Sequence, residues 1–197
     1  MAWVRSEYAG EFAVISAWIA MVLPWNVVYH PEAPIDSTVV FFRFSVFELQ
    51  LRFPTVFKAG DQLVSAANAL ATLYPGTRLF SGVFVTTPGG AISHYASLES
   101  ASQYMYLGSY AWALGALALL CSFAVSVAFY LREEAFVERS PLDPVRLIGG
   151  LLAVATGATA AASVLYYLER DLAGVPIPIG VLIIGALATA LLRVERR

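Results

Sequence analysis

The chain has 197 residues; 59% of them are hydrophobic, only 13% are charged, and the formal net charge at pH 7 is −2. Soluble domains carry about 25% charged residues, so this depletion of charge is typical of a membrane protein. The lack of a basic surface argues against a nucleic-acid partner, and the single cysteine excludes a framework of internal disulfides.

Four hydrophobic runs of about 20 residues predict helices that cross the membrane. They cover residues 12–29, 104–130, 147–168 and 175–192. Pro24 lies inside the first run, where a kink is expected rather than the end of the helix. Asp143 and Pro144 precede the third run and suit an N-cap and a first helical residue. These runs predict a membrane all-α four-helix bundle.

Residues 39–53, VVFFRFSVFELQLRF, are almost as hydrophobic but contain Arg43, Glu48 and Arg52. In a spanning helix each charge near the bilayer centre costs about 2.5–3.5 kcal/mol, which outweighs about 0.3–0.6 kcal/mol gained per apolar residue. Apolar and polar residues alternate instead, which predicts a half-buried strand outside the bilayer. The alternation slips once at Phe47, which indicates a bulge or a bend.

The long loop between the first two spans, residues 30–100, is expected to form a small β-rich (α+β) extracytoplasmic domain. Its sequence predicts a helix over residues 62–74 and strands over 79–86 and 91–98, joined by a turn at 87–90. The alternative is a set of amphipathic segments that lie flat on the membrane surface.

Arginines near the ends of the spans predict the orientation of the chain. The loop between the second and third spans holds Arg132 and Arg139, and the C-terminus holds Arg193, Arg196 and Arg197. Because positive charge is concentrated in cytoplasmic loops, both termini are expected in the cytoplasm of a multi-pass cell-membrane protein.

The remaining parts of the chain flank the loop domain. Residues 1–29 are expected to hold the cytoplasmic N-terminus and the first span, and residues 101–197 the other three spans, a short outer loop and the cytoplasmic C-terminus. A cleaved signal peptide is the alternative for the first span. Glu7 and Glu11 accompany Arg5, so the start of the chain lacks the positive charge of such a peptide.

Small residues recur at every fourth position of the third predicted span: Gly149, Ala153, Gly157 and Ala161. Small residues at this spacing let two helix backbones approach closely. The row is therefore expected to pack against another helix, either within the chain or in a second subunit.

The interiors of the predicted spans contain no Asp, Glu, Lys, Arg or His, which argues against a pump, a proton-coupled transporter or an intramembrane protease. Cys121 lies alone in the second span, and His30 and His94 lie outside the spans without the spacing of metal ligands. No catalytic residue, metal site or cofactor is therefore predicted. Arg43, Glu48 and Arg52 are expected on the solvated face of the extracytoplasmic strand, as a partner-binding site.

Four segments carry a resemblance to a known family: WVRSEYAGEFAV, PVRLIGGLL, GVPIPIGVL and LLRVERR. They resemble uncharacterised haloarchaeal multi-pass membrane proteins, some of which are classed near the archaeal sortase-like processing enzyme. The resemblance covers the N-terminus and the last two spans well and the loop domain poorly. It implies a haloarchaeal plasma membrane, and it brings no catalytic residues.

The sequence thus predicts a non-enzymatic integral membrane protein whose extracytoplasmic domain docks a protein partner or caps a membrane complex. Its expected contacts are the lipid bilayer and either a protein partner or further copies of the chain. One alternative is an oligomeric carrier or channel for a small neutral solute. Another, implied by the resemblance alone, is an accessory to surface-protein processing.

Overall fold

The computed structural model describes residues 8–33, 37–54, 56–59, 62–65, 82–97, 102–132, 143–169 and 175–194. Within these ranges the helices are α1 (Ala9–Val22), α3 (Pro88–Ser97), α4 (Gln103–Leu131), α6 (Pro144–Leu168) and α8 (Ile179–Leu192). The strands are β1 (Asn26–Ala33), β2 (Ser37–Arg43), β3 (Glu48–Pro54), β4 (Val56–Ala59), β5 (Gln62–Ser65), β6 (Gly82–Thr86) and β7 (Val175–Ile177).

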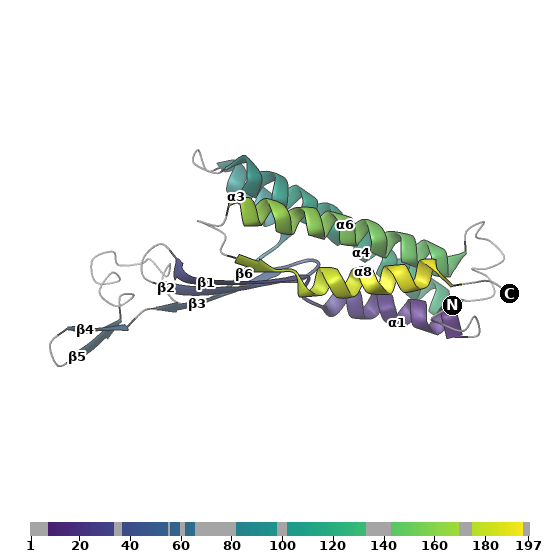
Figure 1. Ribbon diagram of the computed structural model, residues 1–197, viewed down its shortest axis with the longest axis horizontal. Helices are drawn as coiled ribbons and strands as arrows, with labels where there is room; N and C mark the ends of the chain where they lie inside the picture. The colour runs from purple at the N-terminus through teal and green to yellow at the C-terminus, as the bar shows by residue number, and fades with distance from the viewer. Residues whose placement is uncertain are drawn as a thin grey trace.

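The described elements form two layers. The long helices α4 and α6 pack side by side as one layer (Figure 1). The other layer consists of an antiparallel five-stranded sheet, with the order β6-β3-β2-β1-β7, and of α1 and α8, which lie beyond one end of the sheet. Strands β4 and β5 pair with each other in a separate two-stranded sheet.

The predicted all-α bundle of four membrane-spanning helices is wrong. Among the described residues, only α4 and α6 are long and apolar enough to cross a membrane by length and composition, and α1 and α8 have 14 residues each. The first predicted span contains both α1 and the start of β1. Proline disfavours the helical conformation in the residue before it, and Leu23 before Pro24 is extended (φ −75°, ψ 132°).

The fourth predicted span likewise begins with a strand, because Pro176 and Pro178 each disfavour the helical conformation in the residue before them. β7 pairs with β1, which follows α1 in the chain. The five-stranded sheet therefore combines segments that lie far apart in the chain. It is continuous with α1 and α8 and does not form a separate loop domain.

The strand predicted for residues 39–53 is confirmed in type, but it is two strands rather than one. β2 and β3 form a hairpin in which Phe44 N–H donates to the Phe47 carbonyl at 2.8 Å. The alternation slips at Phe47 because the chain reverses between Phe44 and Phe47, so of the expected bulge or bend the structure has a bend, the turn of the hairpin.

Two predictions for the segment after β6 are wrong: the turn at residues 87–90 and the strand over residues 91–98. Residues 91–98 were expected as a strand after a turn, but Pro88 is the first residue of α3. Thr87 caps this helix, since its Oγ1 accepts from Gly90 N–H at 3.1 Å and its carbonyl accepts from Ala91 N–H at 2.9 Å.

The helix predicted over residues 62–74 is wrong where it overlaps strand β5, and the rest of it lies outside the described residues. The strand predicted over residues 79–86 is confirmed as β6 for its described part.

The starts of the two long helices follow from their caps. Asp143 accepts from Val145 N–H at 3.2 Å with Pro144 in the first turn, as predicted for α6. Ser102 accepts from Tyr104 N–H at 3.2 Å at the start of α4. Small residues then bring the helices together, since a Cβ at Gly115 of α4 would lie 2.8 Å from Thr159 of α6.

The C-terminal end of α1 and the N-terminal end of α8 meet at one end of the sheet. We call this end of the sheet its base. Trp25 N–H donates to the Arg43 carbonyl at 2.8 Å, and the Trp25 carbonyl accepts from Val181 N–H at 3.3 Å. A Cβ at Gly180 would lie 2.2 Å from the Pro24 carbonyl oxygen. The close approach of two backbones therefore requires glycine at position 180, and it holds both helix–strand junctions at one level.

Replacing Gly180 by alanine is expected to lower the free energy of unfolding by about 1–3 kcal/mol, because the new Cβ overpacks against main-chain atoms. The matched control is Gly157→Ala on α6, where no heavy atom of the described residues lies within 4 Å of a new Cβ. This control should be neutral or stabilising by up to about 1 kcal/mol. Thermal unfolding in detergent, followed by circular dichroism, checks both; equal melting temperatures would contradict the junction.

Candidate functional site

One face of the sheet carries polar residues at its base and faces the long helices. Residues that pair across antiparallel strands point to the same side. The pairs Asn26–Arg43, Arg43–Glu48 and Glu48–Thr86 therefore form one row across four strands. We call these four residues the base row. Asn26, Arg43 and Glu48 are only 0%, 2% and 6% exposed, so three of the four residues of the base row lie in the interior, and Thr86 is partly buried.

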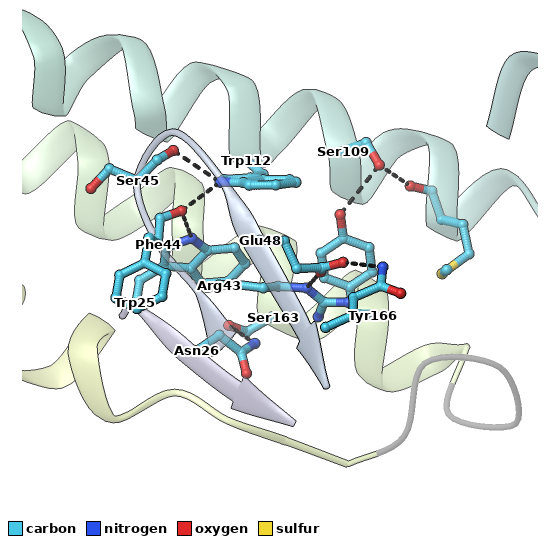
Figure 2. Close-up of polar contacts among 12 residues, drawn as sticks. Trp25, Asn26, Arg43, Phe44, Ser45, Glu48, Ser109, Trp112, Ser163 and Tyr166 are labelled. Carbon is cyan, nitrogen blue, oxygen red and sulfur yellow. Dashed lines mark hydrogen bonds and ion pairs between the residues drawn. The ribbon is translucent and has the colours of Figure 1, made fainter. Parts of the chain in front are cut away.

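An ion pair is the centre of this row. Arg43 Nε donates to Glu48 Oε2, and Gln50 Nε2 donates to the other oxygen of the same carboxylate at 2.7 Å (Figure 2). The guanidinium carbon of Arg43 lies 4.0 Å from the ring centroid of Tyr166 on α6. The negative face of that ring stabilises a cation. The buried charges are thus matched by each other and by the helix that covers them.

The hairpin turn next to the ion pair is held by two tryptophans. Trp25 Nε1 and Trp112 Nε1 each donate to the Phe44 carbonyl at 3.0 Å, and Trp112 Nε1 also donates to the Ser45 carbonyl at 3.0 Å (Figure 2). These carbonyls belong to the turn, where an unpaired buried carbonyl is costly. Trp112 thereby attaches the sheet to α4. Asn26 Nδ2 attaches it to α6 by donating to Ser163 Oγ at 3.2 Å.

A cavity of about 690 Å³ opens beside the ion pair, between the sheet, α3 and the facing parts of α4 and α6. Its polar wall includes Glu48, Gln50 and Arg52, which alternate along β3. Aromatic rings from five elements also line it: Phe41, Phe84, Tyr95, Trp112 and Tyr166. Pockets of this size and mixed polarity are typical of small-molecule sites.

The chemistry of the lining favours a ligand with acceptor oxygens. Arg52 Nη2 donates to Gln50 Oε1 at 3.1 Å, and its guanidinium carbon lies 4.6 Å from the Phe84 ring centroid. Three of the lining rings, those of Phe41, Phe84 and Tyr166, therefore already lie against an arginine, which disfavours an organic cation. Burial, and then the charge of Glu48, raise the pKa of Tyr95, so its hydroxyl stays protonated and can donate.

The structure brings the three residues of the predicted partner-binding site together, but not on a solvated face. Arg43 and Glu48 are buried, and Arg52 is partly buried and lines the cavity. The alternation of residue types along the strands indicated that the two faces of the sheet differ in polarity. It did not reveal that the polar face is covered by Tyr166, which is more than 100 residues away in the chain.

The row of small residues on α6 does not face a single neighbour within the chain. A Cβ at Gly149 would lie 3.0 Å from Leu191 on α8, so this end packs inside the molecule. Ala153 is partly buried, whereas Gly157 and Ala161 are exposed. Packing against a second subunit remains a prediction for the exposed part of the row.

Sequence reasoning missed the contributions of Trp25, Trp112 and Tyr166. The only signal was the presence of indole and phenol groups inside predicted spans, where a buried polar tip needs a partner. Cys121 is exposed on α4. In the described part of the chain, no three His, Cys, Asp or Glu side chains are grouped closely enough to hold a metal ion.

The buried ion pair predicts a large difference between single and double substitutions. Glu48→Gln leaves a buried guanidinium without its counter-charge, which should lower the free energy of unfolding by about 3–5 kcal/mol. The double substitution Arg43→Met with Glu48→Leu removes both charges and should recover most of that loss.

The control for this prediction is Arg146→Met, which removes an exposed pair with Asp143 at 4.0 Å and should leave the melting temperature nearly unchanged. Chemical unfolding in detergent measures all three variants. A double variant that is less stable than Glu48→Gln would show that the charges themselves are not the critical feature.

Comparison with known proteins gives a family but no activity. No curated protein and no solved structure matches the chain. A family model matches residues 2–196, and its description is a family of unknown function (DUF7549). The expectation of an uncharacterised family is thereby confirmed. Because this match covers almost all of the 197 residues, the chain belongs to the DUF7549 family of unknown function.

Proposed function

We propose that the chain is a non-enzymatic integral membrane protein that binds a small amphipathic molecule in the cavity between its sheet and its long helices. The observation that carries this proposal is the cavity itself, which joins a polar wall on β3 to a set of aromatic rings. α4 and α6, the two helices suited by length and composition to crossing a membrane, support the membrane location.

The proposed orientation has both termini in the cytoplasm and the sheet on the outer side. In support of it, α1 begins and α8 ends at the same end of the molecule, away from the sheet (Figure 1). The arginines near the C-terminus favour the cytoplasm for that end. We also propose a haloarchaeal membrane and a link to surface-protein processing, and the support for both is the resemblance.

The ligand we propose has an apolar body and a head with acceptor oxygens, such as a carboxylate. Gln50 and Arg52 of the sheet and Tyr95 of α3 supply donors in the cavity lining. Phe41 and Phe84 flank Gln50 on the sheet, and Met105, Trp112 and Tyr166 of the long helices add further apolar surface. A fatty acid has this combination of groups and serves as the probe.

Gly90 and Gly89 offer a matched pair of variants on the first turn of α3. Gly90 lines the cavity, whereas a Cβ at Gly89 has no heavy atom of the described residues within 4 Å. Gly90→Leu should weaken binding of a medium-chain fatty acid by about tenfold or more, equivalent to about 1.4 kcal/mol, while Gly89→Leu should bind like the wild type.

Native mass spectrometry of detergent-solubilised protein counts the bound molecules in this experiment. The fatty alcohol of the same chain length provides a second arm, because it lacks the charged acceptor and should bind more weakly than the acid. Equal binding by the two leucine variants, or equal binding of acid and alcohol, would contradict the proposed site.

A second candidate function is the docking of a protein partner, as the sequence suggested. One observation favours it: β6 is an edge strand of the described sheet, and its Val83 and Val85 are 65% and 64% exposed. An edge strand can pair with an extended segment of another chain. A partner that co-purifies stoichiometrically in mild detergent and is lost on Val83→Lys would support docking; retention of the partner would place it elsewhere.

A further inference from the structure

The face of the sheet that points away from α4 and α6 is apolar on all five strands. Its first row, next to the helix junctions, consists of residues that pair in register: Val27, Phe42, Leu49, Val85 and Ile177. We call this set the first outer row. The second outer row lies two residues further along each strand and consists of Tyr29, Val40, Leu51, Val83 and Val175.

At its base, the sheet places polar residues on the covered face and apolar residues on the other face, which is the reverse of the pattern in a soluble protein. An antiparallel sheet with one solvated face normally places apolar residues inside and polar residues outside. Here the covered face carries Arg43, Glu48 and Gln50, whereas Val85 and Ile177 of the opposite face are 64% and 48% exposed. A contiguous apolar surface of this kind indicates an apolar environment.

The lengths of α1 and α8 point to lipid as that environment. Each has 14 residues, which extend over about 21 Å, or about 9 Å less than the hydrocarbon core of a bilayer. Glu11 in the first turn of α1 and Arg193 after the end of α8 mark the boundary at the far end. The residues between each helix and its strand, together with the adjoining end of the strand, supply the missing length.

The contacts at the base of the sheet place both junctions at the same depth. Val181 N–H donates to the Trp25 carbonyl, and Gly180 lies against Pro24. β1 therefore continues the layer of α1 at the level where β7 leads into α8. The first outer row thus extends the exposed apolar surface of the two helices, which includes Val22 and Ile179.

We propose that acyl chains of the bilayer cover the first outer row, so that the base of the sheet is immersed in lipid beside α4 and α6. This inference rests on the proposed membrane location. It differs from a four-helix bundle, since one layer crosses the outer part of the hydrocarbon as a β-sheet. The second outer row then lies near the headgroups, where Tyr29 has the amphipathic side chain typical of that level.

Immersion is compatible with the polar groups at this depth. The charges of Arg43 and Glu48 point toward α4 and α6 and are paired, as intramembrane charges usually are. Main-chain groups of β1, β2 and β3 bond to neighbouring strands on both sides. The described sheet has two edges: β7 has only three residues, with Pro176 lacking an N–H to leave unpaired, and of the other edge strand, β6, only its last residues, Val85 and Thr86, lie at this depth.

Site-directed nitroxide labelling in lipid nanodiscs tests the proposal. Cys121, the single cysteine, is first replaced by serine, and one cysteine is then introduced at Leu117, Val85 or Gly89. Leu117 is an exposed residue of α4 and reports on the membrane location; Gly89 is an exposed residue of α3 and reports on water. Collisions with oxygen mark acyl chains, and collisions with a water-soluble nickel chelate mark the aqueous phase.

The label at Val85 should match the label at Leu117, with frequent oxygen collisions and loss of the nickel collisions seen at Gly89. Nickel access at Val85 with oxygen access at Leu117 would overturn this inference and leave the membrane location intact. Nickel access at Leu117 would overturn both. Protection of Val85 from both reagents would also overturn the inference, because it would mean that a protein partner or a second copy covers the sheet.

A label at Ile177 provides an independent measurement in the same row and is read in the same way. It decides the question if the Val85 variant does not fold, which tryptophan emission would reveal. Phe53 lies beyond the second outer row, and a label there should regain nickel access. Equal oxygen access at Phe53 and Ile177 would contradict the proposed depth.

Discussion

The ion pair between Arg43 and Glu48 is the interaction on which the arrangement of the two layers depends. Two charges withdrawn from water are tolerated only when they are paired and covered. The pair spans the β2–β3 hairpin, so it requires this register of the two strands. It also requires a group that covers it, and Tyr166 of α6 does so by placing its ring over the guanidinium.

The close contact between the sheet and the helices follows from this requirement. Trp112 reaches from α4 to the carbonyls of the hairpin turn, and Asn26 reaches from β1 to α6. Gly115 lets α4 and α6 approach each other, and Gly180 lets α8 approach the end of α1. Each glycine lies where a side chain would separate two elements, so the small residues allow close packing within each of the two layers.

The candidate site is a consequence of the same arrangement. Polar residues recur at every second position of β3, so the strand that carries Glu48 also presents Gln50 and Arg52 to the space beneath α3. Near the base, the helices close over this face and the charges are buried. Further along the strand the helices leave a cavity, and the polar residues that continue this alternation form a wall suited to a ligand.

The sequence by itself determined features that depend on near neighbours. Residues 104–130 and 147–168 were recognised as helices, Asp143 and Pro144 as a helix start, and residues 39–53 as strand structure, because propensity, capping and alternation act over a few residues. The same local reasoning failed at Pro24 and Pro88. A proline is compatible with a kink, a turn or a first helical turn, and the neighbouring residues did not distinguish these outcomes.

Only the tertiary structure decided which face of the strands is covered. Alternation shows that two faces differ in polarity, but it contains no information about what lies against each one. The polar face was assigned to water because three charges in a short segment are costly to bury singly. That cost falls when Glu48 neutralises Arg43 and when Tyr166, distant in sequence, covers the pair. Such compensation depends on contacts between distant segments, which exist only once the chain has folded.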